Sequence, residues 1–327
     1  MPLNDDQRWL DAAARLSARG VPAAHPNPSV GAIVVRDGTV LARGWTRASG
    51  RPHAEAVALA AAGEAARGAT LYVSLEPCAH QSTRGPACAG LIAGSGLARV
   101  VIGCGDPDPR TAGKGVAAIR AAGITVEQIS SPACAASLAG YLRRTTLARP
   151  HIALKLALSE DGALARPPGE SQWITGEPAR AHVHAVRARM DAILVGAGTL
   201  ASDNPRLDVR LPGLEQRSPQ RWLLSKHAAP DGWQAMAEPK GVFAMGDVQY
   251  LMVEGGAQTA RAFLQAGLID RLMLYRAPIT IGAGVPSLPE LTHQSLAAVD
   301  SDWQLCDQRQ LGNDALEVYE RSLCSLE

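Results

Sequence analysis

The chain has 327 residues, and two domains are the natural expectation for this length. Hydrophobic residues make up 46% and charged residues 19%, and no apolar run reaches the roughly 18 residues of a membrane-spanning helix. The formal net charge is +1, without a long basic tract, which argues against a nucleic-acid-binding protein. We therefore expect a globular protein with neither nucleic-acid nor membrane partners.

Two features of the sequence bear on the cellular compartment. Residues 1–20 have the mixed pattern of an amphipathic helix and lack the apolar block of a secretion signal. The six cysteines are too few for a disulfide framework in a chain of this length. We expect a cytoplasmic protein with reduced thiols, some of which bind metal.

The first half of the chain predicts a β-hairpin followed by alternating helices and strands. Residues 30–35 and 39–45 flank the Asp37-Gly38 turn and are typical of a hairpin. The alternation that follows indicates an α/β layered domain, which we place at residues 1–147, before the helix-disfavouring Arg149-Pro150. The patterns behind this prediction are helices at 54–66, 88–94 and 115–123, and strands at 70–75, 99–103 and 124–129.

The second half, residues 148–327, predicts another α/β domain. Residues 211–247 are punctuated by proline and glycine and are only weakly periodic. The remaining segments read as strands at 151–158, 192–196, 250–256 and 271–279, and as helices at 178–189 and 259–267.

Three short segments of the first half together predict a zinc site. They are His53-Ala54-Glu55, Glu76-Pro77-Cys78 and Pro86-Ala87-Cys88. One imidazole and two thiolates leave a tetrahedral zinc ion one open position for water, whose pKa the metal lowers toward about 7. Glu55 would carry the proton from this water to a departing amine, as in zinc deaminases. The sequence therefore predicts a zinc-dependent deaminase acting on a nucleobase-like ring, with His53, Cys78 and Cys88 as ligands.

Other interpretations of these residues are weighed against the zinc site. An isolated H-x-E is common, and a lone cysteine is often a small core residue. A closed structural site would need a fourth ligand, for which His80 is the candidate. Pro77 suits the first turn of a helix, and we expect the positive end of that helix to favour the Cys78 thiolate.

Several motifs of the first half resemble the bifunctional deaminase/reductase family of riboflavin biosynthesis. The resemblance implies a cytidine-deaminase-like three-layer domain that removes the ring amine of 2,5-diamino-6-ribosylamino-4(3H)-pyrimidinone 5′-phosphate. It also implies that Asn27 hydrogen-bonds the pyrimidine, although an asparagine between prolines can simply form a turn. The motifs are His25-Pro26-Asn27-Pro28-Ser29-Val30-Gly31, Pro52-His53-Ala54-Glu55, Leu75-Glu76-Pro77-Cys78, and Asp106-Pro107-Asp108-Pro109 followed by Gly113-Lys114-Gly115.

The loop before the second cysteine departs from this family. The family usually has T-P-P-C there, whereas this chain has Arg84-Gly85-Pro86-Ala87-Cys88. An ungapped alignment places Ala87 on the ligand position. The loop therefore has to shift by one residue to offer Cys88 to the metal.

The second half is similar to the family's reductase through segments 154–162, 169–175, 196–210 and 253–256. The resemblance implies a dihydrofolate-reductase-like domain that uses NADPH to reduce the ribosyl group of 5-amino-6-(5-phosphoribosylamino)uracil to ribityl. No G-x-G-x-x-G follows a strand, so a Rossmann site is not expected, but Gly255-Gly256 before a helix suits phosphate. Matched positions imply NADPH contacts from Ala157, Trp173, Thr199, Asp203, Ser225 and Gly256, and substrate contacts from Ser171, Arg187, Leu207, Arg210 and Glu254.

The reductase half also departs from the family, and other functions stay open. Glu160 replaces the apolar residue of S-L-D-G, and the segment between Arg210 and Glu254 is shorter than usual. One alternative is a deaminase whose degenerate reductase domain serves oligomerisation. Another is a nucleic-acid-editing deaminase, whose usual P-C-x-x-C is not found here. The family leads us to expect a homo-oligomer that acts on small phosphorylated pyrimidines.

Overall fold

The structure is a computed structural model that describes residues 5–80, 83–165, 173–282, 284–286, 288–298 and 301–321. The chain forms two compact units, Met1–Ala148 and Arg149–Glu327, and each is described by itself. Within the described residues, no helix combines the length and the apolar character that a membrane crossing requires.

The first unit is built on a five-stranded sheet in the order β2-β1-β3-β4-β5. The predicted hairpin is confirmed, because β1 and β2 pair antiparallel across a turn in which Asp37 and Gly38 both have positive φ. β3 pairs antiparallel with β1, whereas β3, β4 and β5 run parallel. The strands are β1 (Gly31–Arg36), β2 (Thr39–Trp45), β3 (Thr70–Val73), β4 (Arg99–Ile102) and β5 (Thr125–Gln128).

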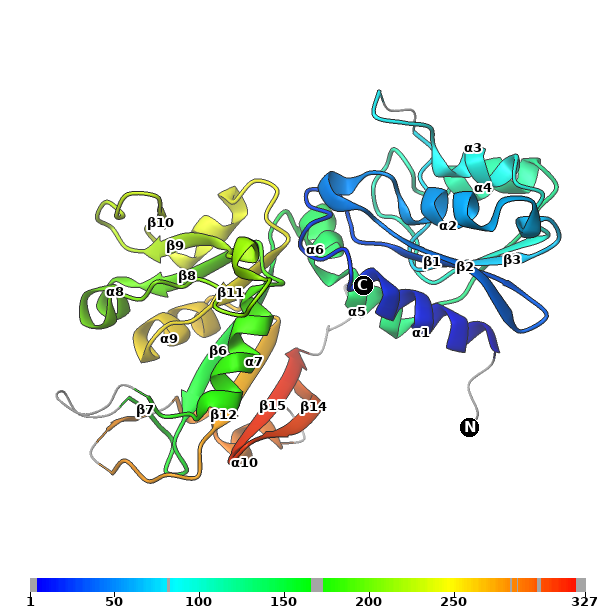
Figure 1. The fold of residues 1–327 in the computed structure, drawn as a ribbon. Helices are drawn as coiled ribbons and strands as arrows, with labels where there is room; N and C mark the ends of the chain where they lie inside the picture. Colours follow the sequence, from blue (N-terminus) through cyan, green and yellow to red (C-terminus); the bar gives the residue numbers. More distant parts are fainter. Residues whose placement is uncertain are drawn as a thin grey trace. The chain divides into compact units, whose positions relative to one another are not determined.

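Helices cover both faces of this sheet, which gives three layers (Figure 1). On one face, apolar residues of α2, α3 and α4 form a core with Val34, Leu71 and Val100 of the strands. On the other face, Leu10 of α1 and Cys134 of α5 pack against Ile33 and neighbouring strand residues. The helices are α1 (Asp5–Ser17), α2 (Ala54–Ala62), α3 (Cys88–Ala93), α4 (Lys114–Ala121), α5 (Pro132–Ser137) and α6 (Ala139–Leu147), of which α5 and α6 were not predicted.

The second unit contains an eight-stranded sheet in the order β10-β9-β8-β11-β6-β12-β15-β14. The strands from β10 to β12 run parallel, and β15 and β14 add an antiparallel edge. β7 and β13 form a separate small pair. The strands are β6 (His151–Leu158), β7 (Ala163–Ala165), β8 (Ala192–Gly196), β9 (Gln220–Leu224), β10 (Gln234–Met236), β11 (Tyr250–Val253), β12 (Arg271–Arg276), β13 (Val285–Pro286), β14 (Trp303–Leu311) and β15 (Asp314–Arg321).

Helices again lie on both faces of the sheet in the second unit. Phe263 of α9 belongs to the larger apolar core on one face, and Val183 of α7 belongs to the core on the other face. The weakly periodic segment 211–247 contributes the short strands β9 and β10. The helices are α7 (Glu177–Arg187), α8 (Ala197–Asp203), α9 (Ala257–Gln265) and α10 (His293–Leu296), and short 3-10 turns lie at Ala48–Gly50, Gly63–Ala66, Glu215–Arg217, Pro239–Ala244 and Pro289–Leu291.

Candidate active sites

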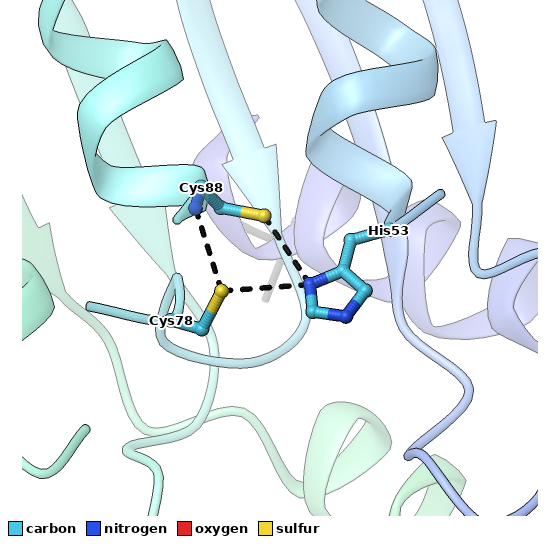
Figure 2. Close-up of side chains that lie close together, drawn as sticks. All are labelled: His53, Cys78 and Cys88. Atoms are coloured by element: carbon cyan, nitrogen blue, oxygen red, sulfur yellow. Dashed lines mark hydrogen bonds between the residues drawn. The ribbon is translucent and has the colours of Figure 1, made fainter. Parts of the chain in front are cut away.

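The three predicted zinc ligands come from three separate elements of the first unit and meet at one point. His53 directly precedes α2, Cys78 lies in the loop that follows β3, and Cys88 is the first residue of α3. The Nδ1 atom of His53 lies 3.5 Å from Sγ of Cys78 and 3.3 Å from Sγ of Cys88 (Figure 2). The sequence separates these residues by up to 35 positions, and the fold brings them together.

The spacing of these atoms fits a tetrahedral metal. Ligands at Zn–S and Zn–N bond lengths are roughly 3.5 Å apart in a tetrahedron. The three donor atoms all lie within 4.8 Å of one another. Among the described residues no fourth His, Cys, Asp or Glu joins this group, and His80 instead lies 3.5 Å from the Thr111 hydroxyl. The arrangement therefore matches an open zinc site, with one position left for water, and argues against a closed structural one.

The loop that departs from T-P-P-C brings Cys88, and not Ala87, to His53. Ala87 caps α3, whereas the Cys88 thiol is buried and faces His53. Two arginines tie this loop to the chain before His53: Nη1 of Arg51 donates to the Pro86 carbonyl at 3.1 Å, and Arg84 donates to the Ser49 carbonyl.

The expectation that a helix begins at Pro77 is wrong. Residues 76–79 form an irregular loop with no helical hydrogen bonds. The start of α3 supplies the expected stabilisation instead, because the Cys88 main-chain N–H donates to Sγ of Cys78 at 3.4 Å. The hydrogen bond between the two cysteines lowers the pKa of the Cys78 thiol and raises that of Cys88. Of the two thiols, Cys78 is therefore the one whose surroundings favour the thiolate.

The loop that carries Cys78 is held by the start of α4. The buried carboxylate of Glu76 accepts hydrogen bonds from the main-chain N–H groups of Gly113 and Val116, at 3.2 and 3.3 Å. A side chain at Gly115 would place its Cβ 2.0 Å from the Pro77 carbonyl oxygen. The Gly113-Lys114-Gly115 motif therefore allows α4 to pack directly against the turn that carries the metal ligand.

Glu55 lies in the first turn of α2, two residues after His53. Its side chain is only 3% exposed, and burial raises its pKa above the ordinary value. A carboxyl group with a raised pKa can both accept and return a proton near neutral pH. This is the property that a proton shuttle between water and a leaving amine requires.

Asn27 lies beside the metal-ligand histidine. Its Nδ2 atom lies 3.1 Å from the Gly50 carbonyl oxygen and 3.2 Å from Nε2 of His53. Gly50 has a positive φ, and a side chain there would collide with the Asn27 side chain. Oδ1 of Asn27 receives no hydrogen bond from any described residue, so it is available to a bound ring.

Glu55, Asn27 and two of the metal-ligand residues, His53 and Cys78, line one cavity of about 270 Å³. A volume of this size suits a small molecule. Three cationic side chains line the same cavity, and so do several acidic ones, which gives it both an anion-binding and a hydrogen-bond-accepting character. The lining residues are Pro26, Asn27, Pro28, Val30, Thr46, Arg51, His53, Glu55, Leu75, Glu76, Cys78, His80, Arg84, Asp106, Asp108, Arg110 and Tyr141.

In the second unit, two predicted substrate residues pair with each other. Nε and Nη2 of Arg187, at the end of α7, donate to the two carboxylate oxygens of Glu254 at 2.6 and 2.9 Å. Lys155 of β6 joins them, with Nζ 3.9 Å from Glu254. Glu254 directly follows β11, and ligands of parallel sheets bind at such carboxyl ends of strands.

In this trio, burial and the neighbouring charges shift the pKa values in opposite directions. Burial works to raise the pKa of Glu254, but Arg187 and Lys155 hold it below the ordinary value. Burial lowers the pKa of Lys155, and Glu254 partly offsets that effect. Lys155 was not among the predicted site residues, although a lysine inside the apolar strand HIALKLAL is itself a signal of function.

The other predicted substrate residues of the second unit differ in their surroundings. The Leu207 side chain is buried in an apolar core, so only its main chain could face a substrate. Arg210 is exposed, and Ser171 lies outside the described residues. Their roles stay predictions.

Two of the predicted NADPH residues, Thr199 and Gly256, meet near the starts of α8 and α9. The Gly256 main-chain N–H, at the start of α9, donates to the Thr199 hydroxyl of α8 at 3.3 Å. A side chain at Gly255 would lie 2.4 Å from Cβ of Thr259, so this turn has to stay bare, which suits a phosphate group at main-chain amides. Ala157 lies in β6, Asp203 ends α8, Ser225 follows β9, and Trp173 is exposed beside Arg180.

Fold and site together define a class of protein: an enzyme with a metal-dependent deaminase unit joined to a second α/β unit. Comparisons with known families agree with this class. The model of the cytidine and deoxycytidylate deaminase zinc-binding region matches residues 3–104, and the model of the RibD C-terminal domain matches residues 150–240 and 242–316.

Individual relatives cover both units. The riboflavin biosynthesis protein RibD of Haemophilus influenzae is 34% identical over 97% of this chain and 97% of its own length. RibD of Escherichia coli is 36% identical over 88% of this chain and 92% of its own length. Among solved structures, RibD of Acinetobacter baumannii superposes with a TM-score of 0.85 at 32% identity, covering 97% of this chain and 98% of that one.

A further solved structure is a diaminohydroxyphosphoribosylaminopyrimidine deaminase/5-amino-6-(5-phosphoribosylamino)uracil reductase from Thermotoga maritima. It superposes with a TM-score of 0.83 at 29% identity, over 97% of this chain and 98% of that one. The chain belongs to the RibD family of bifunctional riboflavin-biosynthesis enzymes, in which a zinc-dependent deaminase is joined to an NADPH-dependent reductase. The predicted fold class, function and cofactors are thereby confirmed.

Proposed function

We propose that residues 1–147 hydrolyse the ring amine of 2,5-diamino-6-ribosylamino-4(3H)-pyrimidinone 5′-phosphate and that residues 148–327 reduce the product. The observation that carries the first step is the convergence of His53, Cys78 and Cys88 on one point beside the buried Glu55. These three side chains would hold zinc through Nδ1 and the two Sγ atoms. When bound, zinc supplies the Lewis acidity that makes water a nucleophile at neutral pH.

Glu55 moves the protons of the first step. It accepts a proton from the attacking water as the new C–O bond forms, and it returns a proton to the amine as the C–N bond breaks. The amine leaves as ammonia, and a ring carbonyl takes its place, which converts the 2-amino pyrimidinone to the uracil. Asn27 lines the same cavity, and its Oδ1 would accept a hydrogen bond from a ring N–H, which orients the reacting carbon.

The charges of the cavity support a phosphorylated substrate. Arg51, Arg84 and Arg110 line it together with the metal-ligand cluster, and the guanidinium fork suits the oxygens of a phosphate. Because the cavity holds both a ring-binding end and cationic groups, it fits a nucleotide-like molecule better than an extended nucleic acid. The absence of a nucleic-acid partner and the homo-oligomer stay predictions.

For the second step, Lys155, Arg187 and Glu254 would bind and orient the sugar. Arg187 is hydrogen-bonded to Glu254, and Lys155 forms an ion pair with it. A buried trio of this kind has little freedom to move, so it can hold a ribosyl group in one orientation. Thr199 and Gly256 would bind NADPH at the start of α9. When bound, NADPH supplies the two electrons and the hydrogen that convert the ribosyl group to ribityl. The alternative of a degenerate reductase predicts the same fold with no NADPH oxidation.

Hydrolysis can be tested by the source of the new oxygen atom. The purified protein is given the ribotide in water enriched in heavy oxygen, and the product is analysed by mass spectrometry. We expect one labelled oxygen in the ring for each ammonia released. Ammonia without label incorporation, or no reaction of zinc-loaded protein, would rule out the proposed deamination.

A further inference from the structure

Tyr141 reaches the deaminase cavity from a helix that the sequence analysis did not predict. It lies in α6, and its phenol donates a hydrogen bond of 2.7 Å to Oδ1 of Asp106. Asp106 lies in the loop that follows β4, and both side chains line the cavity that contains His53 and Glu55. The bond therefore connects α6 to the wall of the candidate active site.

The two oxygens of Asp106 have different surroundings. Oδ1 accepts from the Tyr141 phenol and also from the main-chain N–H of Asp108, at 2.9 Å. Oδ2 receives no hydrogen bond from any residue in the described part of the chain. Because Asp106 is only 9% exposed and lines the cavity, Oδ2 is the acceptor that a bound molecule would meet.

The loop that follows Asp106 is anchored at its far end as well. Glu76 accepts from Gly113 N–H, and Arg110 forms an ion pair with Asp108 inside the loop. Tyr141 is thus the anchor at the near end. With both ends fixed, the loop presents Asp106 and Arg110 to the cavity in a preformed arrangement.

The protonation state of Tyr141 suits its role as the donor of this bond. Burial raises the pKa of Tyr141, so the phenol keeps the proton that it donates. Burial also raises the pKa of Asp106, and the bond from Tyr141 works in the opposite direction.

We propose that Tyr141 is a positioning residue for the deaminase substrate: it orients Asp106 so that Oδ2 accepts a hydrogen bond from a hydroxyl of the substrate's sugar. This proposal rests on the proposed function. The sugar is the matching part of the ligand, because Asp106 shares its loop with Arg110, which suits the phosphate, whereas Asn27 lies beside His53, where the ring reacts. The sugar connects these two ends.

The chain offers a matched control for a test by mutation. Tyr72 also donates its phenol to a carboxylate in the first unit, at 2.8 Å to Asp6, but it does not line the cavity. Tyr141→Phe and Tyr72→Phe each remove one hydroxyl and nothing else. We expect Tyr141→Phe to raise KM for the ribotide about tenfold, the effect of losing roughly one oriented hydrogen bond, with kcat and bound zinc unchanged. Tyr72→Phe should leave KM, kcat and zinc content unchanged.

Two further measurements separate positioning from loss of structure. The dissociation constant of the ribotide is measured in Glu55→Gln protein, which does not turn it over, with and without Tyr141→Phe. We expect about tenfold weaker binding with the second substitution. In an Asp106→Asn background, adding Tyr141→Phe should change KM less than twofold, because the residue through which Tyr141 acts is already altered.

Each outcome has a distinct meaning. Ribotide binding by Glu55→Gln protein that Tyr141→Phe does not weaken would overturn the role of Tyr141 and leave the proposed function intact. An equal rise of KM in Tyr72→Phe would also overturn it, because the effect would then follow from any lost phenol bond. No ribotide binding by Glu55→Gln protein at all would instead reject the substrate of the proposed function, and this inference with it.

Discussion

The Nδ1 atom of His53 lies 3.3 Å from Sγ of Cys88, although an ungapped alignment with the related motif T-P-P-C places Ala87 on the ligand position. The preceding residue, Ala87, serves as the cap of α3. The loop thus has the one-residue shift that the sequence requires, and the first residue of α3 is the candidate ligand. This relationship leads directly to a test of the ligand set.

Replacing Cys88 should remove the metal, and replacing its neighbour should not. Cys88→Ser exchanges a thiolate for a hydroxyl, which is a poor ligand for zinc, so we expect loss of bound zinc and of ammonia release. Ala87→Ser places a hydroxyl at the cap, where serine is favoured, and should keep full zinc. Metal analysis of the two purified variants decides the matter. Full zinc in Cys88→Ser would show that the ligand assignment is wrong.

Glu55→Gln should separate metal binding from chemistry. The amide fills the same buried space but cannot take up the proton of water, so we expect zinc content to stay at the wild-type level. Ammonia release should fall by roughly 10²–10⁴-fold, the usual contribution of a general acid and base. The measurement is the initial rate of ammonia formation by zinc-loaded protein. A rate within a few-fold of the wild type would mean that another group moves the proton.

The charged trio of the second unit predicts a selective loss of reduction. Glu254→Gln leaves Arg187 and Lys155 without their countercharge. We expect NADPH oxidation to fall by at least roughly 10²-fold, because both cations lose the position in which they hold the sugar. Ammonia release should be unchanged, and the exposed substitution Glu238→Gln serves as the control. Parallel loss of both activities would indicate unfolding rather than a reductase role.

The ion pair between Asp6 and Arg99 predicts how the stability of the first unit depends on pH. Both carboxylate oxygens of Asp6 accept from Arg99 at 2.8 Å, and these bonds lower the pKa of Asp6 in the folded protein. A depressed pKa means that the stabilisation is present above the unfolded value of about 3.9 and is lost as the pH falls through the folded value.

Asp6→Asn should therefore lower the free energy of unfolding of the first unit by about 2 kcal/mol at neutral pH. The difference from the wild type should shrink below about pH 4, where Asp6 is protonated in the unfolded chain. Denaturant titrations at pH 7 and at about pH 3 measure both values. Asp5→Asn is the control, because the Asp5–Arg8 pair is exposed and should contribute little. A constant difference at both pH values would contradict the assigned cause.

Local patterns were enough to predict much of this molecule. The 54–66 helix, the hairpin at Asp37-Gly38 and the positions of the strands follow from periodicity and turn chemistry, because each is set by residues close in sequence. The meeting of His53 with the two cysteines was predicted from their side-chain chemistry, because one imidazole and two thiolates form the ligand set of an open zinc site. Long-range pairs gave no such signal: Tyr141 and Asp106 are 35 residues apart, and nothing near either residue indicates the other.

The remaining errors have physical causes as well. Pro77 is compatible with a helix start, but its neighbour Glu76 is held by main-chain N–H groups of Gly113 and Val116, a distant contact that local sequence does not reveal. The hairpin of β14 and β15 was not predicted, because β14 is an edge strand with mostly exposed side chains and shows no apolar alternation.

The central claim is that one chain deaminates and then reduces the same ribotide. The most direct measurement feeds the diaminopyrimidine ribotide to purified protein of known zinc content and follows ammonia and NADPH together. We predict ammonia release with or without NADPH, and NADPH oxidation that begins only after ammonia appears and reaches the same molar amount. Ammonia without any NADPH oxidation would show that the second unit is not a reductase, and no ammonia from zinc-loaded protein would contradict the account as a whole.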